Sequence, residues 1–381
     1  MSRNSSVAYI TPGRYLVASV DDPNSSHVDS QREEDQPRSK SILIWTRFVH
    51  DDPSEWRQIF SRQIRGECPQ KCDITENKEH WRSADAILFK QVSNVKYPPW
   101  HYTNQTWILF SIEAPTHKSW IIPNRRKDVF DWTMTYHSAS DVVMPYGRVV
   151  PLSSYQLISS IEHSRDYWSE KTNTKFAIWM VSKCETPSRR EKYVTYLQRY
   201  VKIDIYGDCG TLKCGSRVIL PKLAKNHSHE DCYELVNQYK FYFAFENSIC
   251  EYYITEKFFK ALQMDVIPVV FGGGNYSLVA PHSSYINAMD FETPQDLAYY
   301  LQRVASNQTL YNSYFNWKRR YSVELGFPFS PIICDLCRKL HQQSDNASRN
   351  IKNAKSKNKS GHYYDVRKWF NTISKCRSWE A

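Results

Sequence analysis

Short runs of continuous apolar residues alternate along this chain with segments of helical spacing. In the first half the runs are Ile42-Leu43-Ile44-Trp45, Ala86-Ile87-Leu88-Phe89 and Trp107-Ile108-Leu109-Phe110. Runs of this length, apolar at every position, are typical of parallel strands that are buried on both faces. Residues 54–65 between them carry apolar side chains at helical spacing. Strands that alternate with helices predict an α/β unit.

A second series of the same kind follows residue 175. We expect strands over 176–181, 203–206, 241–245 and 266–271. Three helix starts are legible between them. Ser188 with Glu191 predicts a capping box, Thr255 predicts an N-cap, and Thr293 with Pro294 predicts another. The expected buried faces of these helices comprise Tyr193, Val194, Leu197 and Tyr200; Phe258, Phe259, Ala261 and Leu262; and Leu297, Tyr300, Leu301 and Val304.

The two series predict two Rossmann-like domains that face one another. The 381 residues are enough for two cores. The expected division is a polar, flexible stem over 1–40, a first domain over 41–170, a second over 171–342 and a basic extension over 343–381.

Composition indicates a partner and a compartment. The net charge of +10 favours a ligand that carries phosphate. The ten cysteines and eight Asn-X-Ser/Thr sequons favour the oxidising secretory pathway. No run approaches the about 18–20 apolar residues of a membrane span. We therefore expect that an N-terminal anchor is missing from this sequence.

Several familiar chemistries have no motif here. The dinucleotide fingerprint and the Gly-x-Ser-x-Gly elbow do not occur in the sequence. The Walker A pattern is also missing, because Gly272-Gly273-Gly274 is followed by Asn275 and not by Lys-Ser/Thr. No Asp-x-Asp pair is present, which disfavours a divalent ion held by carboxylates. The single Cys-x-x-Cys, Cys334 and Cys337, has no partner at zinc-ribbon spacing, so we expect no metal site.

Polar residues instead concentrate where a buried strand ends. Glu246, Asn247 and Ser248 follow the run 241–245, and the carboxyl ends of parallel strands are where α/β proteins bind ligands. Lys257 and Arg190 both fall in the first turn of an expected helix, where a cation opposes the helix dipole unless an anion binds there. Two such cations in one domain indicate a pyrophosphate clamp; the alternative is two solvated surface charges.

These segments resemble the donor-binding signature of the alpha-1,3-fucosyltransferases. The resemblance rests on Phe241 to Ser248, Tyr253 to Lys257 and Val266 to Gly272, with further matches at Val181-Ser182, Arg190, Tyr206-Gly207, Pro145-Tyr146-Gly147 and Cys334-x-x-Cys337. It implies a GT-B fold, in which two facing Rossmann-like domains hold the active site in the cleft between them. It further implies a GDP-fucose donor, inversion at the anomeric carbon and a type II protein on the lumenal side of the Golgi apparatus. It also implies that no cofactor is strictly required, although Mn²⁺ or Mg²⁺ could stimulate transfer.

The resemblance assigns roles to individual residues. Lys257 and Arg190 would neutralise the diphosphate, as fixed cations do where negative charge develops. Asn247 and Tyr253 would bind phosphate or ribose, and Glu256 the ribose hydroxyls. The catalytic base would be Glu113, which ends a first-half strand. The rival base is Glu246, which we prefer as a structural hydrogen-bonding group on the donor side, with Ser248 beside it.

Some positions depart from the family pattern. Tyr136 and Asp141 match supporting positions near the acceptor, but His137 stands where relatives have arginine and Ala139 where they have aspartate. We expect His137 to be packed or exposed and not catalytic. Tyr252 occupies a position that is often acidic. For the cysteines our hypothesis is that Cys334 and Cys337 pair with Cys68 and Cys72, and that Cys184 pairs with Cys232.

The sequence therefore predicts an alpha-1,3-fucosyltransferase that acts on N-acetylglucosamine of glycoprotein glycans, with GDP-fucose and the glycan as its partners. The basic extension and Asp335-Leu336 favour the innermost residue of N-glycans as acceptor. The alternatives are a Lewis-type enzyme acting on outer N-acetyllactosamine and a non-catalytic glycan- or nucleotide-binding homologue. Nucleic-acid binding is disfavoured, because no recognition motif accompanies the basic residues.

Overall fold

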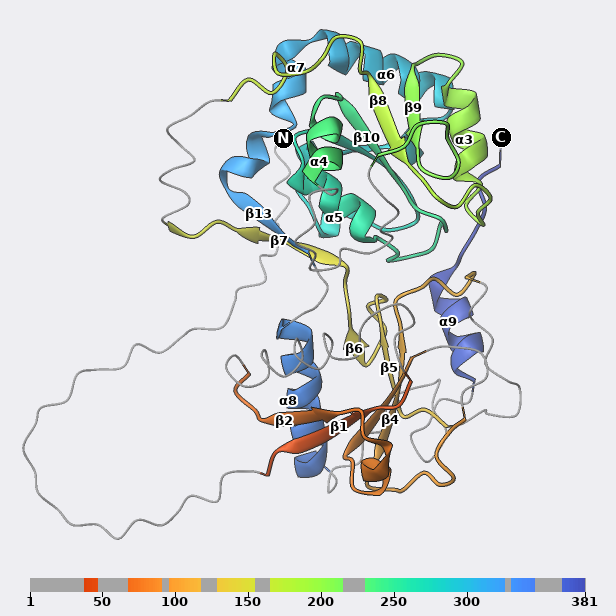
Figure 1. The fold of residues 1–381 in the computed structure, drawn as a ribbon, viewed down its shortest axis with the longest axis vertical. Helices are drawn as coiled ribbons and strands as arrows, with labels where there is room; N and C mark the ends of the chain where they lie inside the picture. The colour runs from red at the N-terminus through yellow and green to blue at the C-terminus, as the bar shows by residue number, and fades with distance from the viewer. Residues whose placement is uncertain are drawn as a thin grey trace, which may run out of the picture. The chain divides into compact units, whose positions relative to one another are not determined.

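The computed structural model describes residues 38–46, 68–90, 96–117, 129–154, 165–214, 230–325, 330–346 and 365–380 (Figure 1). The stem expected over 1–40, apart from its last three residues, and the helix expected over 54–65 lie outside these ranges. Residues Ser39–Ala381 cluster as one compact unit.

The first sheet has six strands in the order β2-β1-β3-β4-β5-β6, and each neighbouring pair is parallel. Its strands are β1 Lys40–Ile44, β2 Cys72–Thr75, β3 Ala86–Lys90, β4 Thr106–Ser111, β5 Trp132–Thr135 and β6 Val142–Val143. Every residue of β4 is buried, which explains why its sequence is apolar on both faces. The three strands expected in this half are confirmed.

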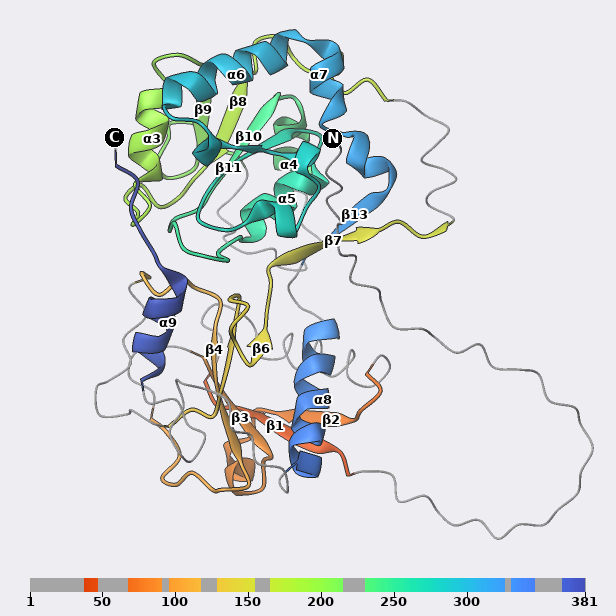
Figure 2. The same ribbon diagram turned by 180° about the vertical axis from the view of Figure 1, so that it is seen from behind.

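The second sheet has five parallel strands in the order β12-β11-β10-β8-β9 (Figure 2). They are β8 Ala177–Met180, β9 Ile203–Tyr206, β10 Phe241–Phe245, β11 Ile267–Phe271 and β12 Ile286–Asn287. The first strand of each sheet lies between the second and the third, so both sheets have the strand order of a doubly wound fold. The predicted α/β class, with two Rossmann-like parallel sheets, is confirmed.

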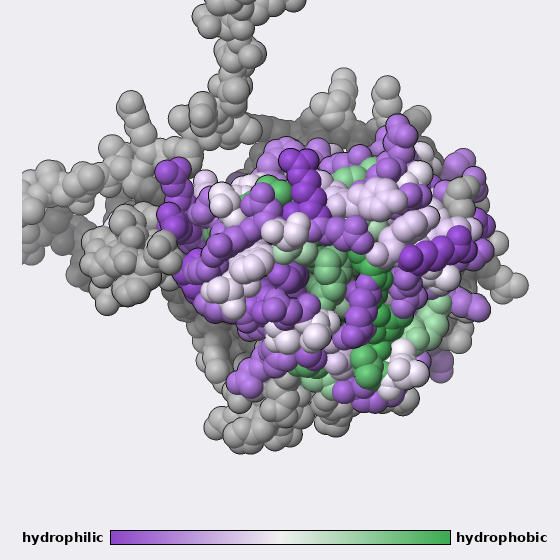
Figure 3. Space-filling view, turned by 90° about the horizontal axis from the view of Figure 1, so that it is seen from above, coloured by the Kyte–Doolittle hydropathy of each residue, from purple (hydrophilic) through white to green (hydrophobic). Residues whose placement is uncertain are grey.

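Helices of the second half follow the expected apolar faces. They are α3 Arg190–Leu197, α4 Glu230–Asn237, α5 Glu256–Gln263, α6 Pro294–Ser306 and α7 Gln308–Ser313. Thr255 caps α5, and Thr293 forms a capping box with Asp296 on α6, so both predicted N-caps are confirmed. Helix α6 turns polar residues outward, and the face seen from above is mostly hydrophilic with a limited hydrophobic stripe (Figure 3).

One predicted helix start is wrong. Residue 189, not Ser188, precedes α3, and it has φ 57° and makes no side-chain cap bond. Glu191 accepts a hydrogen bond from Thr186 at 2.9 Å in place of the expected capping box. Tyr200 lies beyond the end of α3 and is exposed, although the rest of the predicted apolar face is buried.

Later segments of the chain return to the first sheet. Helix α8, Ser330–Asn346, buries Ile333, Leu336 and Leu340 in the same core as Ile42 and Leu88. Helix α9, Val366–Ser374, packs into the other core of that sheet. Strand β7, Gly147–Pro151, pairs antiparallel with β13, Tyr321–Leu325. A division at residue 342 does not describe this return of α8, and the domain boundaries stay a prediction.

Candidate active site

The switch point of the second sheet lies between β8 and β10, whose carboxyl ends lead into residues 181–183 and 246–248. Arg190 connects these two ends, because its guanidinium donates to the carbonyl oxygens of Phe245 and Lys183. Ligands of open α/β sheets bind outside such switch points. The predicted cation therefore stands at the position where the topology favours a ligand.

Arg190 is only 4% exposed, and its Nε atom is buried without a hydrogen-bond partner. Burial lowers its pKa, against the opposing field of Glu246. An unpartnered buried donor on a buried cation is costly for the protein alone. The expectation of a solvated surface charge is excluded for Arg190, and an anion at this point would satisfy the free donor.

Ser188 supports this arginine in a way that its sequence position did not predict. Its hydroxyl donates to the backbone oxygen of Glu246 at 2.8 Å, and its amide donates to the oxygen of Asn247 at 3.0 Å. The segment before α3 therefore runs along the polar end of β10. The same hydroxyl also accepts from the amide of Arg190 at 3.3 Å, so Ser188 positions Arg190 through several contacts without forming the predicted capping box.

Glu246 is fully buried at the end of β10. Its two carboxylate oxygens accept from the amide and the hydroxyl of Thr255, at 2.7 and 2.9 Å, and it pairs with Lys257 at 3.4 Å. Burial raises the pKa of Glu246 and Lys257 opposes this. The carboxylate thus fixes the start of α5, which is the structural role that the sequence favoured for it.

Lys257 already has protein partners, so it is not the unpaired cation that its position in the first turn of α5 suggested. Its Nζ donates to Thr255 at 2.9 Å and to Glu256 at 3.1 Å, in addition to its pair with Glu246. Burial alone would lower the pKa of Lys257, but the two glutamates raise it. The pKa of Glu256 is lowered, since Lys257 outweighs the effect of burial. Arg190 also acts on the pKa of Lys257, so the two predicted cations share one charge cluster.

Two further polar residues follow Glu246. The Oδ1 atom of Asn247 is buried with no hydrogen-bond partner, so it is an unused acceptor that follows the strand end contacted by Arg190. The hydroxyl of Ser248 lies 2.7 Å from that of Thr116, which belongs to the loop after β4. Asn247 is therefore equipped to receive a ligand, and Ser248 connects the end of β10 to the loop that holds Glu113.

Glu113 lies half-buried in that loop and contacts residues 249–253, which we call the donor segment because it contains the predicted donor-binding residue Tyr253. The hydroxyl of Tyr253 donates to its Oε2 over 3.4 Å. Burial raises the pKa of Tyr253 well above its ordinary value, so it remains a neutral donor. The ring of Tyr136 lies 4.8 Å from that of Tyr253, and Tyr146 donates to the oxygen of Ile112. The predicted base and a predicted donor-binding residue are thus brought together.

The segment from 136 to 141 has a more structural character. Asp141 accepts from the amide and hydroxyl of Thr133, at 2.8 and 3.1 Å, which closes the turn between β5 and β6. His137 is 4% exposed and its Nε2 contacts the oxygen of Ile373 at 3.2 Å. Of the two expected environments, packed or exposed, the structure shows that His137 is packed.

Tyr276 was missed by the sequence reasoning. It is buried, its hydroxyl has no hydrogen-bond partner, and a Cβ on Gly272 would lie 2.6 Å from it and 3.2 Å from Cγ of Glu246. A Cβ on Gly273 would lie 2.7 Å from the backbone oxygen of Cys250. The glycine triplet is therefore needed for close packing at the site. The sequence signal that could have identified Tyr276 is its position two residues after this triplet.

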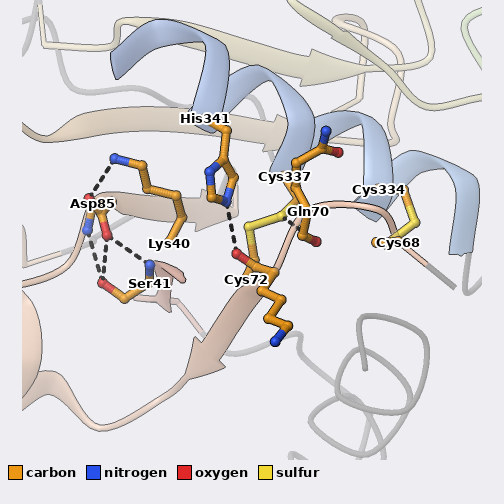
Figure 4. Close-up of a disulfide and its surroundings, with 10 residues drawn as sticks. Lys40, Ser41, Cys68, Gln70, Cys72, Asp85, Cys334, Cys337 and His341 are labelled. Atoms are coloured by element: carbon orange, nitrogen blue, oxygen red, sulfur yellow. Dashed lines mark hydrogen bonds and ion pairs between the residues drawn. A yellow bond between two sulfur atoms is a disulfide. The ribbon is translucent and has the colours of Figure 1, made fainter. Parts of the chain in front are cut away.

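Cys68 pairs with Cys334 and Cys72 with Cys337, so the predicted connection of the Cys-x-x-Cys motif to the first half is confirmed (Figure 4). The predicted pair of Cys184 with Cys232 is wrong. Cys184 instead pairs with Cys209, and Cys232 with Cys214; a further bond joins Cys250 to Cys376. Both observed partners are closer in the chain than the predicted ones, so local loops decide the pairing.

One group of metal-type ligands occurs in the described part of the chain, Cys72, Cys337 and His341. The two sulfurs are joined in a disulfide, and His341 Nε2 lies 2.9 Å from the oxygen of Lys71 (Figure 4). Thiolates are the metal-binding form of cysteine, so this group does not offer a metal centre in the oxidised protein.

A buried cation and unpartnered polar atoms thus lie at the switch point of a doubly wound sheet, which is where such sheets bind ligands. Two family models match this chain: "Fucosyltransferase, N-terminal" over residues 37–147, and "Glycosyltransferase family 10 (fucosyltransferase) C-term" over 168–357. The chain belongs to this family of fucosyltransferases, and the pair of parallel sheets is of the GT-B type that the resemblance implies.

Named relatives agree with the family models. The chain is 32% identical to alpha-(1,3)-fucosyltransferase C of Drosophila melanogaster over 92% of its own length and 82% of that protein. It is 32% identical to glycoprotein 3-alpha-L-fucosyltransferase A of the same organism, over 89% of this chain and 62% of the relative. It is 31% identical to human 4-galactosyl-N-acetylglucosaminide 3-alpha-L-fucosyltransferase FUT5, over 90% and 87%. The identification as an alpha-1,3-fucosyltransferase is confirmed.

Among the residues described, no helix has the length and apolar character of a membrane span.

Proposed function

We propose that this enzyme transfers fucose from GDP-fucose, and that the diphosphate is held where β8 and β10 end. The observation that carries the proposal is Arg190, a buried guanidinium between two strand ends with an unused donor. Asn247 adds an unused acceptor at the same end of β10. Buried polar groups that the protein itself leaves without a partner gain free energy when a ligand supplies a complementary group.

Departure of the diphosphate is the step that these cations assist. As the bond between the anomeric carbon and the phosphate oxygen breaks, negative charge grows on the leaving group. Arg190 stabilises that charge with a rigid fork, while Lys257 contributes from a position fixed by its carboxylate partners. Because protein cations supply this field, we propose that transfer does not require a divalent ion.

Glu113 is the proposed base. The acceptor hydroxyl attacks the anomeric carbon from the face opposite the leaving group and gives its proton to the carboxylate, which results in inversion. Tyr253 contacts this carboxylate and belongs to the donor segment, so it couples the two substrates. Glu246 is the less suitable base, since both of its oxygens are engaged by Thr255.

For the acceptor we propose the innermost N-acetylglucosamine of N-glycans. The sequence features of the extension support this choice, and one relative bears the name glycoprotein 3-alpha-L-fucosyltransferase. The competing acceptor is outer N-acetyllactosamine, which corresponds to the name of the human relative. We also propose that the enzyme acts on the lumenal side of the Golgi apparatus, which the five disulfides of the described residues support.

The test is an acceptor assay read by mass spectrometry. The protein is incubated with GDP-fucose and either a core N-glycopeptide or N-acetyllactosamine, with and without a metal chelator. Gain of one fucose on the glycopeptide supports the proposal, and gain on lactosamine alone would replace its acceptor. Binding of GDP without transfer to either would favour a non-catalytic homologue.

Two matched variants assign the base. Glu113→Gln should retain GDP binding and lose about 100- to 10,000-fold in kcat, the range that general bases contribute. Glu246→Gln should retain kcat within about tenfold and weaken donor binding, because it loosens the start of α5. The opposite pattern would assign the base to Glu246.

A further inference from the structure

The last described segment, residues 365–380, contacts both parts of the site, and we call it the C-terminal strap. It begins with α9, whose N-cap Asp365 accepts from the amide of Lys368 at 2.9 Å. Val366 and Phe370 are buried in the same core as Leu43 and Ile87 of the first sheet. The strap is therefore anchored in the first half of the molecule before it reaches the donor segment.

After α9 the strap runs antiparallel to the backbone that precedes Tyr253. The amide of Glu251 donates to the oxygen of Ser374 at 2.8 Å, and the amide of Arg377 donates to the oxygen of Ile249 at 2.9 Å. The disulfide from Cys250 to Cys376 lies between these two bonds. Backbone and covalent bonds thus hold the donor segment at three successive residues.

The strap then reaches the segment that delivers Arg190. The hydroxyl of Ser378 donates to the oxygen of Pro187 at 2.8 Å, and the amide of Trp379 donates to the oxygen of Ser188 at 3.2 Å. The Trp379 ring lies 5.1 Å from that of Tyr193, on the buried face of α3. One continuous stretch of chain therefore contacts both segments of the proposed donor site (Figure 2).

Two departures from the family pattern meet beside the strap. The rings of His137 and Tyr252 lie 4.6 Å apart. Nδ1 of His137 accepts from the amide of Ala139, so Nε2 carries the proton and donates to Ile373 of the strap. Tyr252 has φ 61°, a left-handed conformation that is unfavourable for a bulky side chain. Such a backbone persists only where the surroundings hold it.

We propose that the C-terminal strap is a positioning element of the donor site. It keeps residues 249–253 and 187–190 in the geometry that presents Tyr253 and Arg190 to the nucleotide, and Cys376 and Trp379 are its positioning residues. This inference rests on the proposed donor. Holding the site in its bound geometry reduces the cost of binding, so loss of the strap weakens donor binding and leaves the base in place.

The test removes the covalent bond alone. In the full-length chain, the double variant Cys250→Ser/Cys376→Ser should raise the KM for GDP-fucose and the Kd for GDP about tenfold, with kcat within about threefold. The matched control is Cys214→Ser/Cys232→Ser, which removes another disulfide of the second half and should leave both constants unchanged. A general loss of stability would affect both variants alike, so the split between KM and kcat isolates positioning.

A second variant covers the case in which the cysteine variant does not fold. Trp379→Ala keeps every disulfide and should raise KM in the same direction. Amide hydrogen exchange at Glu251 and Arg377 reads the strap without any substrate and should accelerate in the variants. Unchanged exchange and unchanged GDP affinity in a folded variant would overturn the inference. Absence of transfer by the wild-type enzyme would count against the proposed function instead.

Discussion

Replacement of Arg190 by methionine separates a functional cation from a structural one. Methionine has a similar length and no charge. In the present structure one guanidinium contact, to Phe245, is a good charge-assisted bond worth about 1.5–3 kcal/mol, while the 3.4 Å contact to Lys183 contributes little. The opposing costs are several kcal/mol for burying the cation and about 1–3 kcal/mol for the unpartnered Nε.

Methionine also leaves the Phe245 carbonyl without this donor, which costs about 1–3 kcal/mol and offsets most of the remaining difference. Arg190→Met should therefore leave the free energy of unfolding unchanged or raise it by about 1–2 kcal/mol. The same change should lower kcat/KM with GDP-fucose about 100- to 1000-fold, because a fixed charge at the leaving group is lost. A structural cation would show the reverse pattern, with large destabilisation and intact donor binding.

Urea unfolding followed by tryptophan fluorescence measures the first quantity, and calorimetric titration with GDP together with initial rates measures the second. Arg165→Met is the control, since Arg165 pairs with Glu170 at 2.7 and 2.6 Å and with Asp265 at 2.9 Å, and neither partner is a residue of the site. Destabilisation of Arg190→Met by 3 kcal/mol or more, with GDP affinity unchanged, would refute the reasoning.

Three further predictions follow from local geometry. Gly273→Ala places a Cβ 2.7–2.8 Å from backbone atoms of Cys250, so the donor segment must shift. Thermal unfolding should show about 1–3 kcal/mol of lost stability, and titration should show weaker GDP binding; wild-type values for both would contradict the contact. Thr293→Ala removes the capping box with Asp296 and should cost about 1–2 kcal/mol in urea without any change in GDP affinity; an unchanged midpoint would mean that the cap contributes nothing. Burial lowers the pKa of His137, so the folded state binds the imidazole proton less readily than the unfolded state. The free energy of unfolding should therefore be highest above the ordinary pKa of 6.5 and fall as the pH drops below that value. His137→Gln should flatten this dependence when unfolding is measured as a function of pH, and the same slope in both proteins would contradict the prediction.

Sequence patterns foresaw the parts of the site that depend on neighbours in the chain. Thr255 caps α5 because its side chain reaches an amide two residues away, and Phe258 and Leu262 share a face because of the helical repeat. The end of β10 was equally predictable from the sequence, because its continuous apolar run stops at the polar residues Glu246, Asn247 and Ser248. The position of Glu113 at the end of β4 follows from the same rule.

Contacts between residues far apart in the chain could not be predicted from the sequence in this way. The pairing of Cys184 and the contact of Arg190 with two strand ends depend on how loops fold back, and no local pattern encodes that. Ser188 shows the difference clearly. Serine is a favoured N-cap residue, but the hydroxyl of Ser188 donates to the carbonyl of Glu246 just after β10, and that buried carbonyl would be costly to leave unpaired.

The amino-acid order by itself determined the two sets of parallel strands, the caps of α5 and α6 and the resemblance that names the family, because each depends on residues within a few positions of one another. Only the tertiary structure decided that Tyr253 meets Glu113, that Arg190 is buried with an unused donor, and that residues 365–380 return to hold the donor segment. Contacts of this kind join residues far apart in the chain. They exist because the entropy lost in closing those loops is offset by shared burial, hydrogen bonds and disulfides, which no single segment possesses alone.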